Sequence, residues 1–175
     1  AAVQLGFPVV LKGTGVAHKT ESGAVILWLT TREQVVKAAQ KMAGNGFLVE
    51  KMITGAICEL LIGVVLDPAH GYVLTLAAGG TLTELLGDSA SLLIPASADE
   101  VRTTLNGLKI ARLLHGYRGA TPANIDAIVQ AVMAVQAYVT ANHGRIQEVE
   151  INPLICTENG AIAADALIIS GELDV

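Results

Sequence analysis

The sequence has little cysteine, little charge and no long apolar run, and each shortage excludes a class of protein. Two of the 175 residues are cysteines, and neither belongs to a Cys-x-x-Cys or His-rich pattern, which argues against a zinc site or a disulfide framework. Charged residues make up 15% of the chain, the net charge is −5 and the basic residues are scattered, so we expect no nucleic acid partner. Apolar residues, 52% of the total, form short runs cut by glycine, proline or charge, so we expect no membrane span.

What remains is the composition of a compact globular protein. The two cysteines, Cys58 and Cys156, lie in apolar strand-like segments, which favours buried, reduced thiols. Reduced thiols and the lack of a signal-peptide pattern together favour the cytoplasm. Residues Ala1–Gly6 are typical of the last turn of a helix that ends at a glycine, so we expect the chain to be part of a longer protein.

The order of the elements predicts an α+β fold of mixed or antiparallel sheets with flanking helices. Helices are expected at residues 31–43, from the Ser97/Glu100 capping box to about residue 115, and after an N-cap at Thr121. A lobe boundary is expected near residue 53, which divides the chain into 1–53 and 54–175. Strands are expected at residues 8–12, 23–29, 47–53, 57–66 and 72–78, with a terminal pair joined by a turn at Asn159–Gly160.

The segment from Pro8 to Val25 has the residue types of a phosphate-handling loop. A strand ends at Lys12, and the loop after it carries three glycines and His18. Glycines allow backbone N–H groups to approach an anion closely, and the strand end fixes the direction of the lysine. The segment matches neither the P-loop nor the dinucleotide-binding pattern, so an exposed turn with incidental charge is an equal alternative.

The terminal hairpin predicts a second site, because strand alternation places Glu148, Glu150 and Asn152 on one face. A type I′ turn at Asn159–Gly160 would pair Glu158 with Ala161 and set Asp165 diagonal to Asn152 on that face. An Asn/Asp pair backed by Glu150 offers the hard oxygen ligands that suit Mg²⁺. The alternative is the solvated polar face of an edge hairpin.

Taken together, these motifs resemble the ATP-grasp domain of the NDP-forming acyl-CoA synthetases. The likeness is strongest to the ADP-forming acetyl-CoA synthetases and weaker to the succinyl-CoA synthetase β subunit, and the same domain occurs in some protein acetyltransferases. The resemblance spans nearly the whole chain, because the motifs occur in the family's order. They are Pro8–Lys12, His18–Thr20, Gly63 with Asp67–Pro68, Gly79–Gly80, Gly116–Gly119 and Glu150–Pro153.

This resemblance implies an ATP-grasp fold of two lobes that bind ATP or ADP and Mg²⁺ between them. It also implies that the N-terminal part of the ATP-grasp domain is truncated in this chain. Lys12 would contact nucleotide phosphate, and the strand that contains Glu50, Lys51 and Met52 would meet the adenine. The remaining residues that it implies are Leu154, packing with Met52 against the adenine ring, and the Mg²⁺ ligands Asn152 and Asp165.

The resemblance also implies catalytic roles for His18, Glu59 and Glu84. His18 would carry a phosphoryl group between the nucleotide and a phosphohistidine of a partner domain, which suits an imidazole with a pKa near neutrality. The alternative for His18 is a loop histidine that only donates hydrogen bonds. Glu59 and Glu84 would orient the phosphohistidine or the metal, and the alternative for each is an exposed surface carboxylate.

The implied function is that of an acid–thiol ligase, which couples phosphoryl transfer between ATP and ADP to acyl-CoA formation through an acyl phosphate. The implied partners are a CoA-binding domain with its phosphohistidine, an acyl substrate and CoA, in an oligomeric full-length protein. We expect no turnover from this fragment, since the family's CoA-binding part lies outside it. Two alternatives stay open: another ATP-grasp carboxylate ligase, or a regulatory nucleotide-sensing domain fused to an acetyltransferase.

Overall fold

The computed structural model describes residues 1–15, 23–42, 44–79 and 87–171. They form two compact units, Ala1–Thr54 and Gly55–Val175, which we call unit 1 and unit 2. Each unit has its own antiparallel sheet with helices packed on it, so the predicted α+β class with antiparallel sheets and flanking helices is confirmed. No helix within these ranges is long and apolar enough to cross a membrane.

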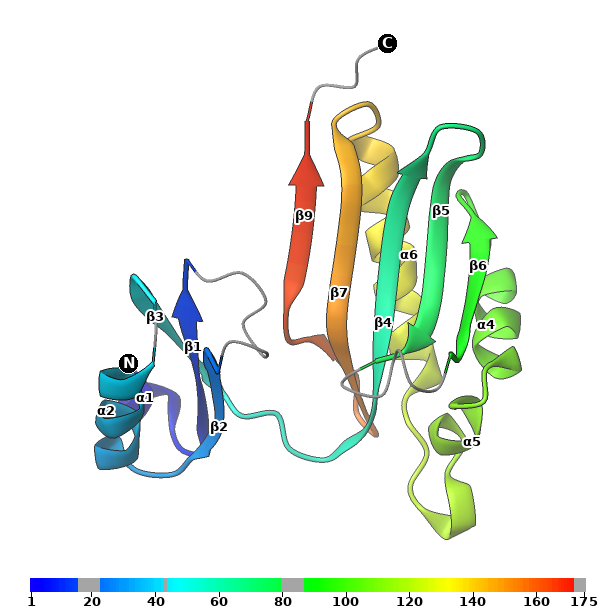
Figure 1. Ribbon diagram of the computed structural model, residues 1–175. Coiled ribbons are helices and arrows are strands. Elements are labelled where there is room, and N and C mark those ends of the chain that lie inside the picture. Colours follow the sequence, from blue (N-terminus) through cyan, green and yellow to red (C-terminus); the bar gives the residue numbers. More distant parts are fainter. Residues whose placement is uncertain (16–22, 43, 80–86, 172–175) are drawn as a thin grey trace. The chain divides into compact units, whose positions relative to one another are not determined.

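Unit 1 is a three-stranded sheet with strand order β2-β1-β3 (Figure 1). Its elements are α1 (Ala2–Leu5), β1 (Val9–Thr14), β2 (Val25–Leu29), α2 (Arg32–Lys41) and β3 (Gly46–Lys51). Val9 and Leu11 of the central strand pack with Leu29, Ala38 and Met42 to form a small core between the sheet and α2. The alternate residues of β1 therefore lie on the sheet face opposite that core.

Strand β2 contains a bulge beside β1. Val9 pairs with Leu29 and Leu11 with Ile26, so two residues of β2, Leu27 and Trp28, oppose one residue of β1. Trp28 has φ 60°, a left-handed conformation that a bulky residue rarely adopts, and its side chain is 57% exposed. The bulge thus turns two apolar side chains of the edge strand away from the core.

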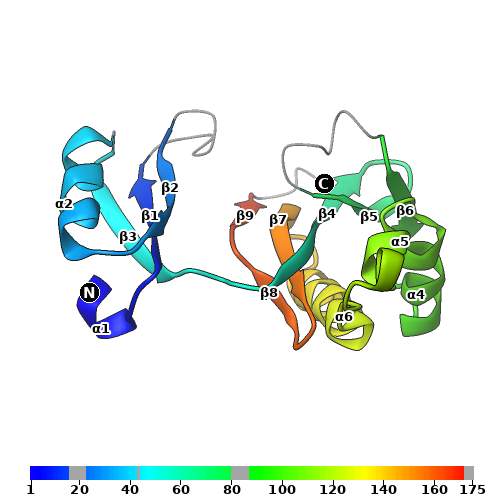
Figure 2. The ribbon, with the colours of Figure 1, turned by 90° about the horizontal axis from the view of Figure 1, so that it is seen from below.

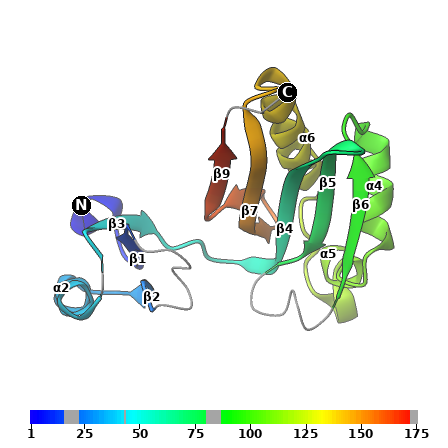
Figure 3. The same cartoon turned by 45° about the horizontal axis from the view of Figure 1, so that its top comes forward.

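Unit 2 is a six-stranded sheet with strand order β6-β5-β4-β7-β8, in which β9 also pairs with β7 (Figure 3). Strands β4 and β7 are twelve residues long and lie at its centre. The strands are β4 (Ala56–Asp67), β5 (Gly71–Ala78), β6 (Ser89–Leu93), β7 (Ile146–Thr157), β8 (Ala161–Ala163) and β9 (Ala166–Ser170). The helices are α4 (Ala98–Gly107), α5 (Ala111–Leu114) and α6 (Ile125–Ala141), with a 3₁₀ turn, η2, at Tyr117–Gly119.

The helices of unit 2 lie on one face of its sheet (Figure 2). The other face carries the polar residues described below together with exposed apolar side chains, among them Val65, Leu167 and Ile169. Leu60, Ile62 and Val64 of β4 point into the core and alternate with side chains on the opposite face. Helix α6 contributes more buried residues than α4 or α5, and its buried apolar residues recur at helical spacing: Ile128, Val129, Val132, Val135 and Val139.

Three predicted details of unit 2 are wrong. The helix expected up to residue 115 is broken, because Leu108 has an extended ψ of 151° and caps α4 before α5 begins. The N-cap of α6 is Asn124, whose side chain accepts a hydrogen bond from the N–H of Ala127, and not Thr121. The hairpin after β7 turns one residue earlier than expected, since the N–H and the hydroxyl of Thr157 both donate to the carbonyl of Gly160.

The capping box of α4 is present as predicted, and it gives a test of the fold. Ser97 accepts from the N–H of Glu100 at 3.3 Å, and the Glu100 carboxylate accepts from the N–H of Ser97 at 2.7 Å. We expect Ser97→Ala to lower the free energy of unfolding by about 1 kcal/mol, measured by urea denaturation, because a helix N–H then loses its acceptor. Ser97→Asp keeps an acceptor and should stay near the wild type; equal losses in both variants would show that the cap is not responsible.

Candidate functional site

In unit 1, the candidate phosphate ligand Lys12 is almost fully buried. Its side chain is 10% exposed and forms an ion pair of 2.5 Å with the carboxylate of Glu50, whose side chain is 37% exposed. Val10 pairs with Glu50 and Lys12 with Leu48 in the β1–β3 ladder, so the ion pair crosses these two strands diagonally, on the face away from α2. A buried ammonium needs such a partner, because leaving water without one is costly.

The strand that was expected to meet the adenine is β3 together with the residues that follow it. Lys51 is exposed, and Met52 is partly buried. The N–H of Met52 donates to the carbonyl of Pro8 at 3.0 Å, which extends the ladder past the end of β3. The N–H of Met52 is therefore used within the sheet.

In unit 2, the structure brings the expected metal ligands Asn152 and Asp165 next to each other. The N–H of Asn152 donates to the carbonyl of Asp165 at 3.3 Å, and that of Ala164 donates to the carbonyl of Pro153 at 3.0 Å. The diagonal placement expected from the turn is thus wrong by two residues, and Asp165 lies directly across from Asn152. A shift of two residues keeps both side chains on the same face of the sheet.

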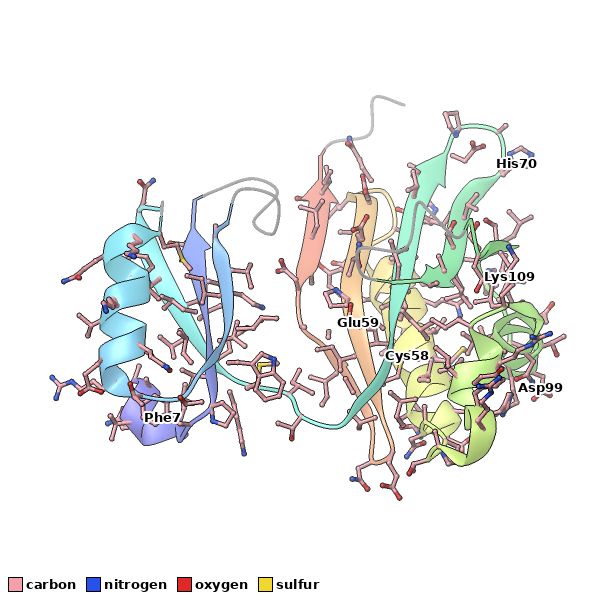
Figure 4. All side chains as sticks on the ribbon, turned by 60° about the horizontal axis from the view of Figure 1, so that its bottom comes forward. Phe7, Cys58, Glu59, His70, Asp99 and Lys109 are labelled. Carbon is pink, nitrogen blue, oxygen red and sulfur yellow. The ribbon has the colours of Figure 1, made fainter. Side chains whose placement is uncertain are left out.

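Other acidic candidates share this polar face. Glu150 pairs with Leu167 of β9 on one side and with Gly63 of β4 on the other. Glu59 alternates with the core residue Leu60, so it also lies on the face away from the helices. Figure 4 labels Glu59 on β4. This face, which we call the polar face, therefore carries Glu59 of β4, Glu150 and Asn152 of β7, and Asp165, which directly precedes β9.

Gly79 explains how the chain leaves β5 beside Glu59. Its N–H donates to the carbonyl of Glu59 at 2.8 Å, and a Cβ on Gly79 would lie 2.6 Å from the carbonyl carbon of Leu60. Only glycine fits this close approach. Residues 80–86, which follow, lie outside the described ranges and include Glu84. The same is true of residues 16–22, which include His18.

The polar face suits Mg²⁺ by the chemistry of its donors. Carboxylate and amide oxygens are the ligands that Mg²⁺ accepts, and it commonly binds only one or two protein carboxylates, with water and phosphate completing the shell. Among the residues that the structure describes, no three His, Cys, Asp or Glu side chains gather at a common metal position. The donors that Asp165 and Asn152 offer therefore suit a metal whose shell is completed by water and phosphate better than a closed structural site.

Leu154 does not share this face. It is 1% exposed and packs in the core of unit 2, opposite Leu60 of β4. The cause is a register shift between Leu60 and Ile62, where β7 carries one more residue than β4. Residues of β7 before the shift point one way and those after it point the other, which the simple alternation could not reveal.

The structure also reveals a pair of residues that the sequence did not. Cys58 of β4 and Cys156 of β7, both free thiols, are direct partners in the ladder between these strands. They are far apart in the sequence, and no local pattern indicates that their strands are neighbours. Burial of the reduced thiols is as expected for Cys156, whereas Cys58 is partly exposed.

The Lys12–Glu50 pair gives a testable prediction. Glu50→Gln should lower the free energy of unfolding by about 1–2 kcal/mol, because it leaves a buried ammonium without this carboxylate. The expected loss is smaller than that for a fully buried pair, since Glu50 is partly exposed to water. In chemical denaturation, the double variant Lys12→Met, Glu50→Gln should lose less free energy of unfolding than the sum of the losses in the two single variants. Strictly additive losses would contradict an energetic coupling of the two side chains.

Comparison with known proteins connects this arrangement to one family. Residues 1–169 match the ATP-grasp domain family. The chain is 31% identical to acetate–CoA ligase (ADP-forming) I of Archaeoglobus fulgidus, over 98% of this chain and 26% of that protein. It is 29% identical to the subunit beta of acetate–CoA ligase (ADP-forming) II of Pyrococcus furiosus, over 96% of this chain and 77% of that subunit.

A solved structure agrees with these matches. Dinucleotide-forming acetyl-coenzyme A synthetase 1 of Ca. Korarchaeum cryptofilum, in complex with coenzyme A and Mg-AMPPCP, superposes with a TM-score of 0.83 at 32% identity, covering 97% of this chain and 79% of that one. The chain spans about a quarter of the length of the Archaeoglobus fulgidus relative. The chain therefore belongs to the ATP-grasp domain family and is homologous to the ATP-grasp portion of ADP-forming acetyl-CoA synthetases.

Proposed function

We propose that this chain is the nucleotide-binding part of an ADP-forming acyl-CoA synthetase, in which it exchanges a phosphoryl group between ATP or ADP and a partner domain. The observation that carries the proposal is the placement of Asn152 beside Asp165 on the open polar face of unit 2. That placement matters because the chain matches ADP-forming acetate–CoA ligases over nearly its whole length.

Unit 1 would hold the nucleotide through Lys12 and β3. The Lys12 ammonium is positioned by Glu50 and acts as a point charge toward phosphate oxygens. Since the N–H of Met52 is bonded to Pro8, the adenine edge would use the carbonyl groups of Lys51 and Met52, with the Met52 side chain against the ring. Leu154, in the core of unit 2, has no part in this contact.

Unit 2 would hold the metal through Asp165 and Asn152, with Glu150 on the same face. Mg²⁺ bound there would neutralise charge on the phosphate oxygens during transfer. The residues of the chain contribute position and charge, because phosphoryl transfer needs little covalent chemistry from the protein beyond a carrier.

His18 would be that carrier. One imidazole nitrogen accepts the phosphoryl group as the N–P bond of the partner domain's phosphohistidine breaks, and it then releases the group to the terminal phosphate oxygen of ADP. Glu59 and Glu84 would orient the incoming segment. The partner domain would bind CoA and form the thioester through an acyl phosphate, so the acyl substrate is selected outside this chain.

Nucleotide binding gives the first test. We expect calorimetric titration of the full-length protein with Mg-ADP to show an affinity that falls about tenfold or more in Asp165→Asn, since a charged ligand to the metal is lost. Glu158→Gln removes one charge from the exposed turn of the same hairpin and should bind like the wild type. With EDTA in place of Mg²⁺, the difference between Asp165→Asn and wild type should disappear; a difference that persists would refute the role of Asp165 as a metal ligand.

The second test addresses His18. His18→Ala in the full-length protein should abolish phosphoryl transfer from radiolabelled ATP to the partner domain while leaving Mg-ADP affinity within about threefold, because the carrier is lost and the nucleotide site is kept. The control is His70→Ala, in the β4–β5 turn, where the side chain is 65% exposed. Unchanged transfer in His18→Ala would remove this residue from the mechanism.

A further inference from the structure

The two cysteines of the chain lie across from each other on neighbouring strands. Cys58 of β4 pairs directly with Cys156 of β7 in an antiparallel ladder. Residues that face each other in such a ladder have Cα atoms about 4.5–5.5 Å apart, with both side chains on the same face. That interval lies within the range of about 4.4–6.8 Å found for disulfide-bonded cysteines. The backbone therefore already meets the distance requirement of a cross-strand disulfide.

The surroundings make the two thiols unequal. Cys156 is 0% exposed within the core of unit 2, and its thiol donates to the carbonyl of Leu154 at 3.6 Å. Cys58 packs against the same core but is partly exposed. An oxidant in solution can therefore reach Cys58, whereas the neighbouring Cys156 is not accessible to solvent.

The acidity of the thiols follows the same order. A hydrogen bond with Cys156 lowers the pKa of Cys58, against the opposing effects of burial and of the Glu59 carboxylate. The same hydrogen bond, followed by burial and by the charges of Cys58 and Glu59, raises the pKa of Cys156. Both effects favour Cys58 over Cys156 as the thiolate, which is the form that reacts with oxidants.

We propose that Cys58 and Cys156 form a reversible oxidation site, in which peroxide converts the dithiol to a disulfide between β4 and β7. The Cys58 sulfur attacks hydrogen peroxide, which forms a sulfenic acid and releases water. The Cys156 sulfur then attacks the sulfenic sulfur, which forms the S–S bond and releases a second water as the proton of the thiol leaves. Two thiols are oxidised, one peroxide is reduced, and a dithiol reductant reverses the reaction by thiol–disulfide exchange.

The bond would join the two central strands that carry the polar face. Glu59 follows Cys58 on β4 and points to the opposite face, as Figure 4 indicates for these consecutive labelled residues. Asn152 lies on β7, on the same strand as Cys156. Oxidation therefore modifies the core side of the strands that present the candidate metal and phosphohistidine residues.

The test is intact-mass and peptide mapping of the folded full-length protein treated with a small excess of hydrogen peroxide. We expect a mass lower by two hydrogen atoms and a peptide that contains Cys58 joined to one that contains Cys156, both reversed by dithiothreitol. The thermal midpoint of the oxidised form should rise, because a bond across so long a loop restricts the unfolded chain.

Variants supply the control. Cys156→Ala should retain Cys58 as a sulfenic or more oxidised species, with a gain of oxygen instead of a loss of hydrogen, and Cys58→Ala should react more slowly because Cys156 is buried. The wild-type peptide map does not depend on whether these variants fold. The proposal is wrong if the joined peptide forms only in denaturant, if both thiols survive in the folded protein, or if the oxidised form melts at a lower temperature.

Discussion

The antiparallel pairing of β4 with β7 is the interaction on which unit 2 depends. These two strands are its longest, and their register decides which side chains enter the core. One shift in that register, between Leu60 and Ile62, divides β7 in two. Before it, Glu150 and Asn152 lie on the open face; after it, Leu154 and Cys156 turn into the core beneath the helices. A single extra residue thus lets one strand serve both a polar face and a hydrophobic core.

Unit 1 faces a different constraint, which is a charge on a buried strand. All but one of the residues of β1 are buried, Lys12 among them, and the carboxylate of Glu50 lies at ion-pair distance from its ammonium. Packed apolar residues at these two positions would avoid the cost of desolvation, so stability alone does not account for the pair. A lysine held in one orientation within a strand does, however, suit a binding site for phosphate, which is the role proposed above for Lys12.

The sequence was sufficient for the features that local chemistry decides. The Ser97/Glu100 pattern identified the start of α4, and the apolar spacing within α6 coincides with its buried face. It failed where tertiary contacts compete with local preference. Asn159–Gly160 is a common type I′ turn sequence, yet neither residue has a positive φ, and Thr157 closes the turn through its hydroxyl. The break of the helix at Leu108 likewise depends on a residue far away in the sequence. The Asp88 carboxylate accepts hydrogen bonds from the N–H groups of Lys109 and Ile110, the two residues after the break.

The nature of the register error explains why the candidate site was nonetheless found. The expected pairing in the terminal hairpin was wrong by two residues, and side chains repeat along a strand with a period of two, so Asn152 and Asp165 stayed on one face. An error of one residue would have placed them on opposite faces. No comparable argument could have found Cys58 beside Cys156, because β5, β6, α4, α5 and α6 all lie between β4 and β7 in the sequence. Alternation within a strand indicates which face a residue occupies, whereas only the pairing of distant strands determines its neighbour. Sites built within one hairpin can therefore be predicted from sequence, and sites built between distant strands need the fold.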